Sequence, residues 1–113
     1  MDNSKISFSG SEVSVAGRSW RVRYRITQAE LVGDRVLVLY DYMTGARDRL
    51  FQNLEAFTLD GVHLWTAEHP STDATGSYVA ITSLSPLRAG SFDCFDCTLD
   101  PSTGKLLKSH FTK

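Results

Sequence analysis

The sequence predicts an all-β protein, either an antiparallel two-layer sandwich or a small, partly open barrel of about seven to nine short strands with at most one short helix. Two observations support this fold class. Short runs of alternating or continuous apolar residues recur along the chain, and turn-forming pairs such as Asp-Gly and Gly-Asp separate them. The 113 residues suit one domain, residues 1–113, which is long enough to bury a single hydrophobic core.

The central prediction is a β-hairpin within residues 54–67, with Asp60-Gly61 at its tip. Asp-Gly favours a two-residue type I′ turn, in which both central residues have positive φ. Both faces of the hairpin carry apolar side chains, so we expect it to be central in its sheet and covered on both sides. A two-residue turn also sets the opposing pairs of the two strands, Phe57 with Leu64 and Ala56 with Trp65.

The N-terminal part of the chain predicts strands that differ in their expected burial. Residues 5–8 and 12–15 predict a hairpin around Gly10. From residue 19 to residue 26, apolar residues alternate with arginines, which predicts a strand with one buried and one solvated face. Residues 35–42 are almost continuously apolar, so we expect a strand that is buried on both faces around residues 37–39. It should follow a turn at Gly33-Asp34 and pair with the arginine-containing strand.

The middle of the chain leaves one alternative open. We expect a loop over residues 43–48 and extended chain from about residue 50. A short helix within residues 46–56 competes with this interpretation, because Ala46, Leu50, Leu54 and Phe57 recur at helical spacing.

The C-terminal part predicts one long loop and three strands. Residues 68–77 are dense in Pro, Gly, Ser, Thr and Asp, which predicts the longest loop of the chain. Residues 78–83, 91–99 and 106–111 predict strands. Between the last two, we expect Asp100 to accept backbone hydrogen bonds and Gly104 to take the left-handed conformation that closes a turn.

A Thr-Leu-Asp tripeptide occurs at residues 58–60 and again at 98–100, each time before an apolar return strand. Over Leu54 to Trp65 and Phe95 to Leu107, the chain resembles the blade hairpins of quinoprotein-type and WD40-type β-propellers. A propeller needs at least about four blades, on the order of 160 residues. The resemblance therefore implies at most two blade-like units, and no propeller function is carried over.

The cysteines and the N-terminal residues predict the compartment. Cys94 and Cys97 are three residues apart, which in a strand directs their side chains to opposite faces. We therefore expect two buried, reduced thiols rather than a redox or zinc pair. Residues 1–10 lack the apolar core of a secretory signal, and no apolar run approaches the roughly 20 residues of a membrane-spanning helix, so we expect a cytoplasmic protein.

The sequence contains no nucleophile elbow, no HExxH motif and no glycine-rich phosphate loop, so we expect no catalytic residues, no metal and no cofactor. The three histidines are scattered, and a lone histidine is usually a surface or hydrogen-bonded core residue. We interpret Asp93, Asp96 and Asp100 as solvated charges, because their spacing does not match a calcium loop.

The candidate binding residues are Arg21, Arg23 and Arg25, which would lie about 7 Å apart on one strand face. Such a row suits phosphates or the carboxylates of a partner. The alternative is a solvated face that pairs with acidic residues of the neighbouring strand. Nucleic acid is disfavoured, because the net charge is −1 and the neighbouring aromatic residues point to the opposite face.

The leading functional hypothesis is a non-catalytic protein-interaction or regulatory module of the inhibitor or immunity kind. We expect a protein partner or self-association as a homodimer. The alternative hypothesis is a carrier that holds a small apolar ligand inside a β-barrel. An enzyme with an unrecognised site is the third.

Overall fold

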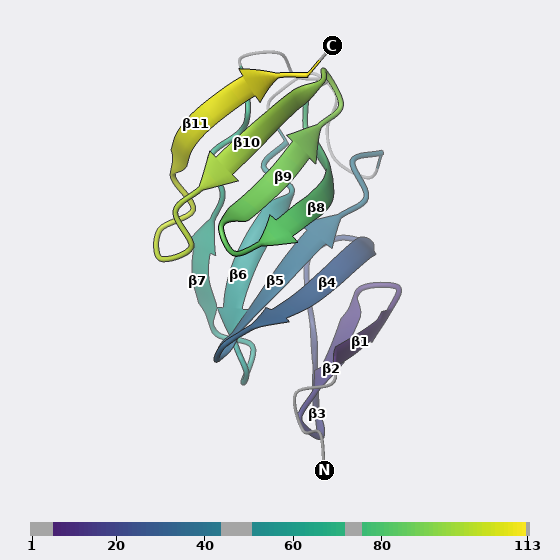
Figure 1. Ribbon diagram of the computed structural model, residues 1–113. Helices are drawn as coiled ribbons and strands as arrows, with labels where there is room; N and C mark the ends of the chain where they lie inside the picture. The colour runs from purple at the N-terminus through teal and green to yellow at the C-terminus, as the bar shows by residue number, and fades with distance from the viewer. Residues whose placement is uncertain (1–5, 44–50, 72–75, 113) are drawn as a thin grey trace.

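The computed structural model describes residues 6–43, 51–71 and 76–112, and within them every strand pairing is antiparallel. The strands form three sheets, in each of which consecutive strands are neighbours (Figure 1). Sheet A consists of β1 (Ile6–Ser9), β2 (Glu12–Val15) and β3 (Arg18–Arg21). Sheet B consists of β4 (Ile26–Val32), β5 (Arg35–Tyr40), β6 (Leu54–Thr58) and β7 (His63–Thr66). Sheet C consists of β8 (Tyr78–Leu84), β9 (Leu87–Ser91), β10 (Phe95–Leu99) and β11 (Leu106–Phe111).

The predicted all-β class is confirmed, and the described ranges contain no helix. They accordingly include no helical segment with the length and hydrophobicity needed to cross a bilayer. The described residues form eleven strands in three sheets, which exceed the expected strand count and number of layers. The additional strands include β4 and β9, which lie almost entirely in segments for which the sequence pattern predicts no strand. Residues 44–50, where a helix within 46–56 would begin, lie outside the described ranges, and the chain is extended from Leu54.

Sheet B lies between the other two sheets and is apolar on both faces. The predicted burial on both faces around residues 37–39 is confirmed and extends to residues 36–40, each of which is at most 2% exposed. On one face, the core with sheet C includes Leu37, Leu39, Leu54, Trp65, Leu87, Ala89, Cys97 and Leu99. On the other face, the core with sheet A includes Val13, Val15, Trp20, Val36, Val38, Tyr40 and Phe57. Burying each large aliphatic side chain contributes about 1.5 to 3 kcal/mol.

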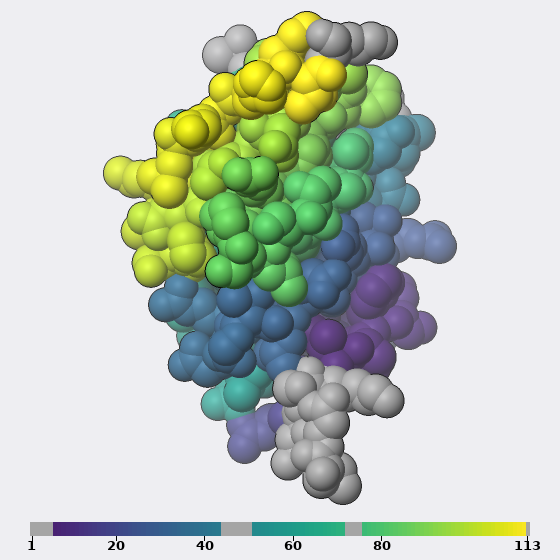
Figure 2. Space-filling view, in the orientation of Figure 1, coloured from purple at the N-terminus to yellow at the C-terminus, as the bar shows by residue number. Residues whose placement is uncertain are grey.

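The outer faces of sheets A and C are polar. In sheet A, three serines lie side by side across the strands, Ser7, Ser14 and Ser19. In sheet C, the corresponding row is Arg88, Thr98 and Lys108. Figure 2 shows sheet C, green to yellow, over the upper part of the visible face, with β4 in blue below it. The stack of three sheets therefore has a polar, solvent-exposed surface at each end and an apolar sheet in its middle.

The reversal at Asp60-Gly61 is confirmed, but its predicted turn type is wrong. Thr58 N–H donates to the carbonyl oxygen of Val62 at 2.8 Å, which closes a three-residue loop over residues 59–61. Gly61 has φ 89°, whereas Asp60 has no positive φ. This is the three-residue hairpin loop that ends on a left-handed residue, rather than a type I′ turn.

The longer loop alters the register of the β6–β7 hairpin. Ala56 lies opposite Trp65 as predicted, but Phe57 lies opposite His63 rather than Leu64, with an irregularity between Ala56 and Phe57. Leu64 is consequently 43% exposed instead of sharing the buried face with Phe57.

The predicted strand over residues 19–26 is interrupted. β3 ends at Arg21, and β4 begins at Ile26. The intervening residues carry the chain from sheet A to sheet B, with Ile26 N–H donating to the carbonyl oxygen of Gly10 at 2.8 Å. β5 therefore pairs with β4 and β6, and the predicted pairing with the arginine segment is limited to its end, where Ile26 lies opposite Tyr40 and the Asp41 N–H donates to the Arg25 carbonyl oxygen at 2.8 Å. Alternation of apolar and charged residues reports exposure correctly here, but it does not identify the pairing partner.

The cysteines also depart from a single continuous strand. Cys94 lies in a turn before β10 and has φ 74°, whereas Cys97 lies within β10. Both thiols are free, as expected, with Cys97 buried and Cys94 half-buried. Burial raises the pKa of the Cys97 thiol, which keeps it in the unreactive neutral form.

One tryptophan connects sheet A to a turn of sheet B, and a second connects sheet B to a turn of sheet C. The Trp20 indole N–H donates to the Leu59 carbonyl oxygen at 3.3 Å, and the Trp65 indole N–H donates to the Pro101 carbonyl oxygen at 2.9 Å. Each indole also covers the turn glycine, Gly61 or Gly104, where a Cβ would collide with the ring. The two Thr-Leu-Asp segments thus occupy equivalent places, at the end of the third strand of sheets B and C.

Two side-chain amides connect sheet B to β8. The Asn53 amide donates to the Tyr78 carbonyl oxygen at 2.7 Å and accepts from the Tyr78 N–H at 3.1 Å. The Gln28 amide donates to the Ile81 carbonyl oxygen at 3.2 Å and accepts from the Ile81 N–H at 2.9 Å. Each amide thus satisfies a backbone donor and acceptor on the outer edge of β8.

Gly104→Ala should destabilise the protein more than Gly33→Ala. Both glycines have positive φ, 76° and 62°, so either substitution places an L residue in the left-handed region at a cost of about 1 to 2 kcal/mol. A Cβ at Gly33 meets no atom within 4 Å, whereas one at Gly104 collides with the Trp65 ring. We expect an additional loss of about 1 to 3 kcal/mol for Gly104→Ala in urea unfolding. Equal losses would contradict the tryptophan contact.

Candidate functional site

A buried carboxylate on the face of sheet B that meets sheet A is the centre of the candidate site. Glu55 is only 3% exposed. One of its oxygens accepts a hydrogen bond from the Tyr40 hydroxyl at 2.6 Å. The other accepts from the Thr66 hydroxyl at 2.6 Å and lies 3.2 Å from the Arg23 guanidinium and 3.1 Å from His63 Nε2. We call these five residues the Glu55 cluster.

The strands of sheet B position most of this cluster. Glu55 lies between Leu54 and Ala56 in β6, and because successive strand residues alternate in direction, its side chain points away from sheet C. Thr66 of β7 lies directly opposite Glu55. Arg23 belongs to the segment between β3 and β4. The part of the chain that connects sheets A and B therefore supplies the positively charged partner of Glu55.

Four donors surround the Glu55 carboxylate, with Tyr40 at Oε1 and with Thr66, Arg23 and His63 at Oε2. Because Thr66 donates its hydroxyl proton to Glu55, we assign a hydrogen to His63 Nε2, which lies 2.8 Å from the Thr66 oxygen. Glu55 therefore acts as an anchor that fixes Arg23 and His63.

A hollow of about 440 Å³ opens beside the cluster and is lined by residues from the β3–β4 segment and from β6 and β7. Its apolar walls are Val22 and Phe57. Its polar walls are Arg21, Arg23, Glu55 and His63. Two guanidiniums and one carboxylate leave an excess of positive charge, so the hollow suits an anionic group that also contacts apolar surface.

The structure brings two of the three predicted binding residues to this hollow. Arg21 and Arg23 line it, whereas Arg25 does not. Arg21 is paired in register with Glu12, and Arg23 is paired with Glu55. The arginines thus have acidic neighbours, as the solvated-face alternative expects, although one of these neighbours is buried.

The sequence pattern does not reveal the acidic centre of the site. It singles out none of Glu55, Tyr40 and Thr66, and it predicts only a surface or hydrogen-bonded role for His63. The available signal was a charged residue inside the apolar strand β6, since a buried charge requires partners.

The other predicted polar groups are separate from this site. Asp93 is half-buried and accepts hydrogen bonds from the Ser71 hydroxyl, at 2.9 Å, and from the Ser91 hydroxyl, so it is not simply solvated. Asp100 accepts from the Ser102 N–H at 2.8 Å within its turn, as predicted. In the ranges that the structure describes, no group of three or more acidic, histidine or cysteine residues is arranged to hold a metal ion.

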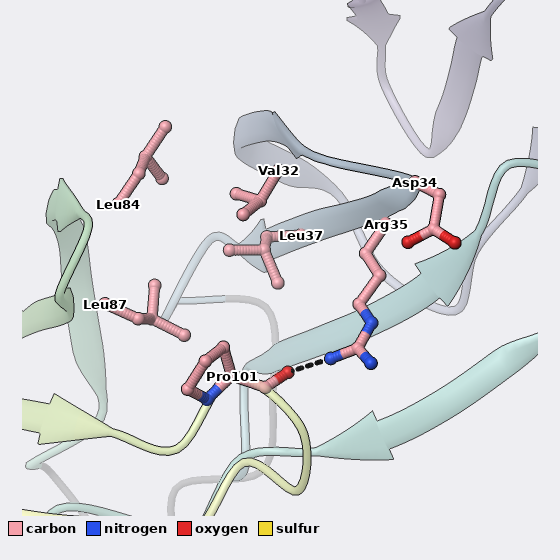
Figure 3. Close-up of a pocket in the computed structure, with 7 residues that line it drawn as sticks. All are labelled: Val32, Asp34, Arg35, Leu37, Leu84, Leu87 and Pro101. Atoms are coloured by element: carbon pink, nitrogen blue, oxygen red, sulfur yellow. Dashed lines mark hydrogen bonds between the residues drawn. The ribbon is translucent and has the colours of Figure 1, made fainter.

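A second cavity lies between sheets B and C, and we call it the apolar slot (Figure 3). Its volume is about 220 Å³. Arg35 lies at its edge and donates to the Pro101 carbonyl oxygen at 2.5 Å. The lining residues are Val32, Asp34, Arg35, Leu37, Leu84, Leu87 and Pro101.

Together, the fold and the site define an all-β protein of three stacked antiparallel sheets with a buried ionic cluster between the first two. The chain belongs to the family described as Domain of unknown function (DUF7957), whose model matches residues 3–111. No curated protein matches the sequence significantly.

Two crystal structures of computationally designed proteins share the fold. The Ika4 protein matches with a TM-score of 0.64 and 17% identity, over 100% of this chain and 69% of the designed chain. The Ika8 protein matches with a TM-score of 0.59 and 16% identity, over 96% of this chain. This chain spans only 36% of the Ika8 chain. At these identities the similarity establishes the fold alone.

Glu55→Gln should destabilise the protein by about 1 to 3 kcal/mol, because the amide that replaces the carboxylate cannot accept both hydrogen bonds that Tyr40 and Thr66 donate and no longer pairs with Arg23. The matched control is Glu12→Gln, which alters an exposed strand residue opposite Arg21 and should change stability by about 1 kcal/mol or less. Urea unfolding of both variants measures the difference. Similar losses would show that the cluster contributes no more than a surface pair.

Stability should fall in alkaline solution, and Tyr40→Phe should weaken that dependence. Burial, followed by the hydrogen bond to Glu55, raises the pKa of Tyr40. A raised folded pKa stabilises the protein fully below the unfolded value of about 10, and this stabilisation is lost as the pH rises above it. Unfolding monitored by circular dichroism and tyrosinate absorbance tests this. An unchanged alkaline midpoint in Tyr40→Phe would contradict it.

Proposed function

We propose that this protein is a non-catalytic protein-interaction module that binds an acidic segment of a partner protein at the hollow beside the Glu55 cluster. The observation that carries the proposal is the pair of exposed guanidiniums, Arg21 and Arg23, beside the apolar walls Val22 and Phe57. Guanidiniums bind carboxylates through paired hydrogen bonds, and arginine is enriched at protein interfaces.

The neighbouring strand adds an apolar contact surface. β7 is an edge strand of sheet B, and Val62 and Leu64 are 61% and 43% exposed there. β11 is an edge strand on the same side of the molecule (Figure 1), and it exposes Leu107 and Phe111. Large exposed apolar side chains on such edge strands are typical of a protein-binding surface.

The Glu55 cluster supports this function by preorganisation. Arg23 is held by Glu55 at 3.2 Å, so less side-chain entropy is lost when a partner binds it. A module of this kind acts by surface complementarity, as an inhibitor or regulatory subunit does. We further propose a cytoplasmic location, which the two free cysteines support because the cytosol keeps thiols reduced.

A second candidate function is the carriage of a small ligand. The apolar slot between sheets B and C supports it, since the slot is lined mainly by aliphatic side chains from both sheets.

Arg21→Glu should weaken the binding of acidic peptides. We would select binders from a random peptide library, then measure affinity for the wild-type protein, for Arg21→Glu and for Arg88→Glu. Arg88 is a matched control, because it is an exposed arginine on the outer face of sheet C. We expect Arg21→Glu to weaken binding by at least about tenfold and Arg88→Glu to leave it unchanged. Selected peptides without acidic residues, or equal losses in both variants, would refute the proposal.

A further inference from the structure

We propose that the apolar slot binds a free amino acid with a branched aliphatic side chain. The proposal deepens the second candidate function, the carriage of a small ligand, by naming the class of that ligand. It is independent of the partner surface at the Glu55 cluster, because the slot lies between sheets B and C.

The interior of the slot matches a compact aliphatic group. Branched side chains line it from both sheets, Val32 and Leu37 from sheet B and Leu84 and Leu87 from sheet C. Its volume of about 220 Å³ is below the roughly 300 to 1,000 Å³ of sites for drug-sized ligands, so the occupant must be small. Leu84 is 37% exposed, so part of the lining lies at the protein surface and the slot is accessible to a ligand from solvent.

Arg35 supplies the partner for a carboxylate. Its guanidinium is fixed by the hydrogen bond from one terminal nitrogen to the Pro101 carbonyl oxygen, at 2.5 Å, which Figure 3 shows at the lower edge of the slot. Within residues 6–43, 51–71 and 76–112, no other hydrogen bond or ion pair of this guanidinium is found. The remaining N–H donors therefore match the two oxygens of a carboxylate.

Asp34 favours a ligand that also carries a positive charge. Its carboxylate lies on the same side of the slot as Arg35, opposite Leu84 and Leu87 (Figure 3). A simple apolar acid would be repelled by this carboxylate, whereas an α-ammonium group would be attracted. An aliphatic amino acid satisfies all three features. Its carboxylate meets Arg35, its ammonium group meets Asp34, and its side chain enters the slot.

The ligand class is tested by titrating the full chain with L-leucine and with three analogues that each lack one group. The analogues are 4-methylpentanoate without the ammonium group, 3-methylbutylamine without the carboxylate, and glycine without the side chain. Calorimetry gives the affinities, and amide chemical shifts locate the site. We expect leucine to bind at least about tenfold more tightly than each analogue, with shifts at the slot. No binding of leucine, or equal binding of 4-methylpentanoate, would overturn the proposal.

The variants test the assigned groups separately. Arg35→Gln removes the carboxylate partner, Asp34→Asn removes the ammonium partner, and Leu84→Phe fills the slot from its exposed side. Each should weaken leucine binding by at least about tenfold, whereas the control Arg88→Gln should leave it unchanged. If Arg35→Gln fails to fold because it loses the contact with Pro101, Asp34→Asn and Leu84→Phe still decide the question.

Failure here is distinguishable from failure of the partner surface. Arg21→Glu should bind leucine like the wild-type protein, and Leu84→Phe should bind acidic peptides like the wild-type protein. Unchanged leucine binding in Asp34→Asn and in Leu84→Phe would refute the slot as the site, whatever the peptide measurements show.

Discussion

Sheet B cannot expose either of its faces to water, and the other two sheets are arranged to meet this constraint. Five consecutive residues of β5, Val36 to Tyr40, are buried, so alternate side chains need an apolar neighbour on each side. Sheets A and C provide these neighbours, and each keeps a polar outer face. The contact of Trp20 with Gly61 then fixes where sheet A meets the β6–β7 turn of sheet B. The contact of Trp65 with Gly104 fixes where sheet B meets the β10–β11 turn of sheet C.

The sequence predicts most of the strands, although not β4 and β9, because burial and turn chemistry are local properties. The alternation before Ile26, the apolar run in β5 and the Asp100 turn are all encoded within a few residues. Pairing is not local. The arginine-containing segment alternates like a strand, yet its residues between Arg21 and Ile26 form the crossing between sheets A and B. The partner of β5 in the sheet is instead the following strand, β4.

The candidate site was predictable only from its exposed half. Arginines in alternation with apolar residues are visible in the sequence, and two of them reach the hollow. The buried half depends on Glu55, whose partners come from β5, β7 and the β3–β4 segment. No short stretch of sequence brings these residues together. The one local indication is that Glu55 interrupts an apolar strand, and a buried carboxylate without donors would be too costly to keep.

The side-chain amides on β8 have a consequence for how the protein avoids misassembly. An uncovered edge strand offers its backbone groups to other chains and so promotes aggregation. Asn53 and Gln28 already occupy the N–H and carbonyl groups of Tyr78 and Ile81, which a foreign strand would need. An incoming strand at sheet C is therefore directed to β11, where Lys108 opposes the burial that a continuous intermolecular sheet requires.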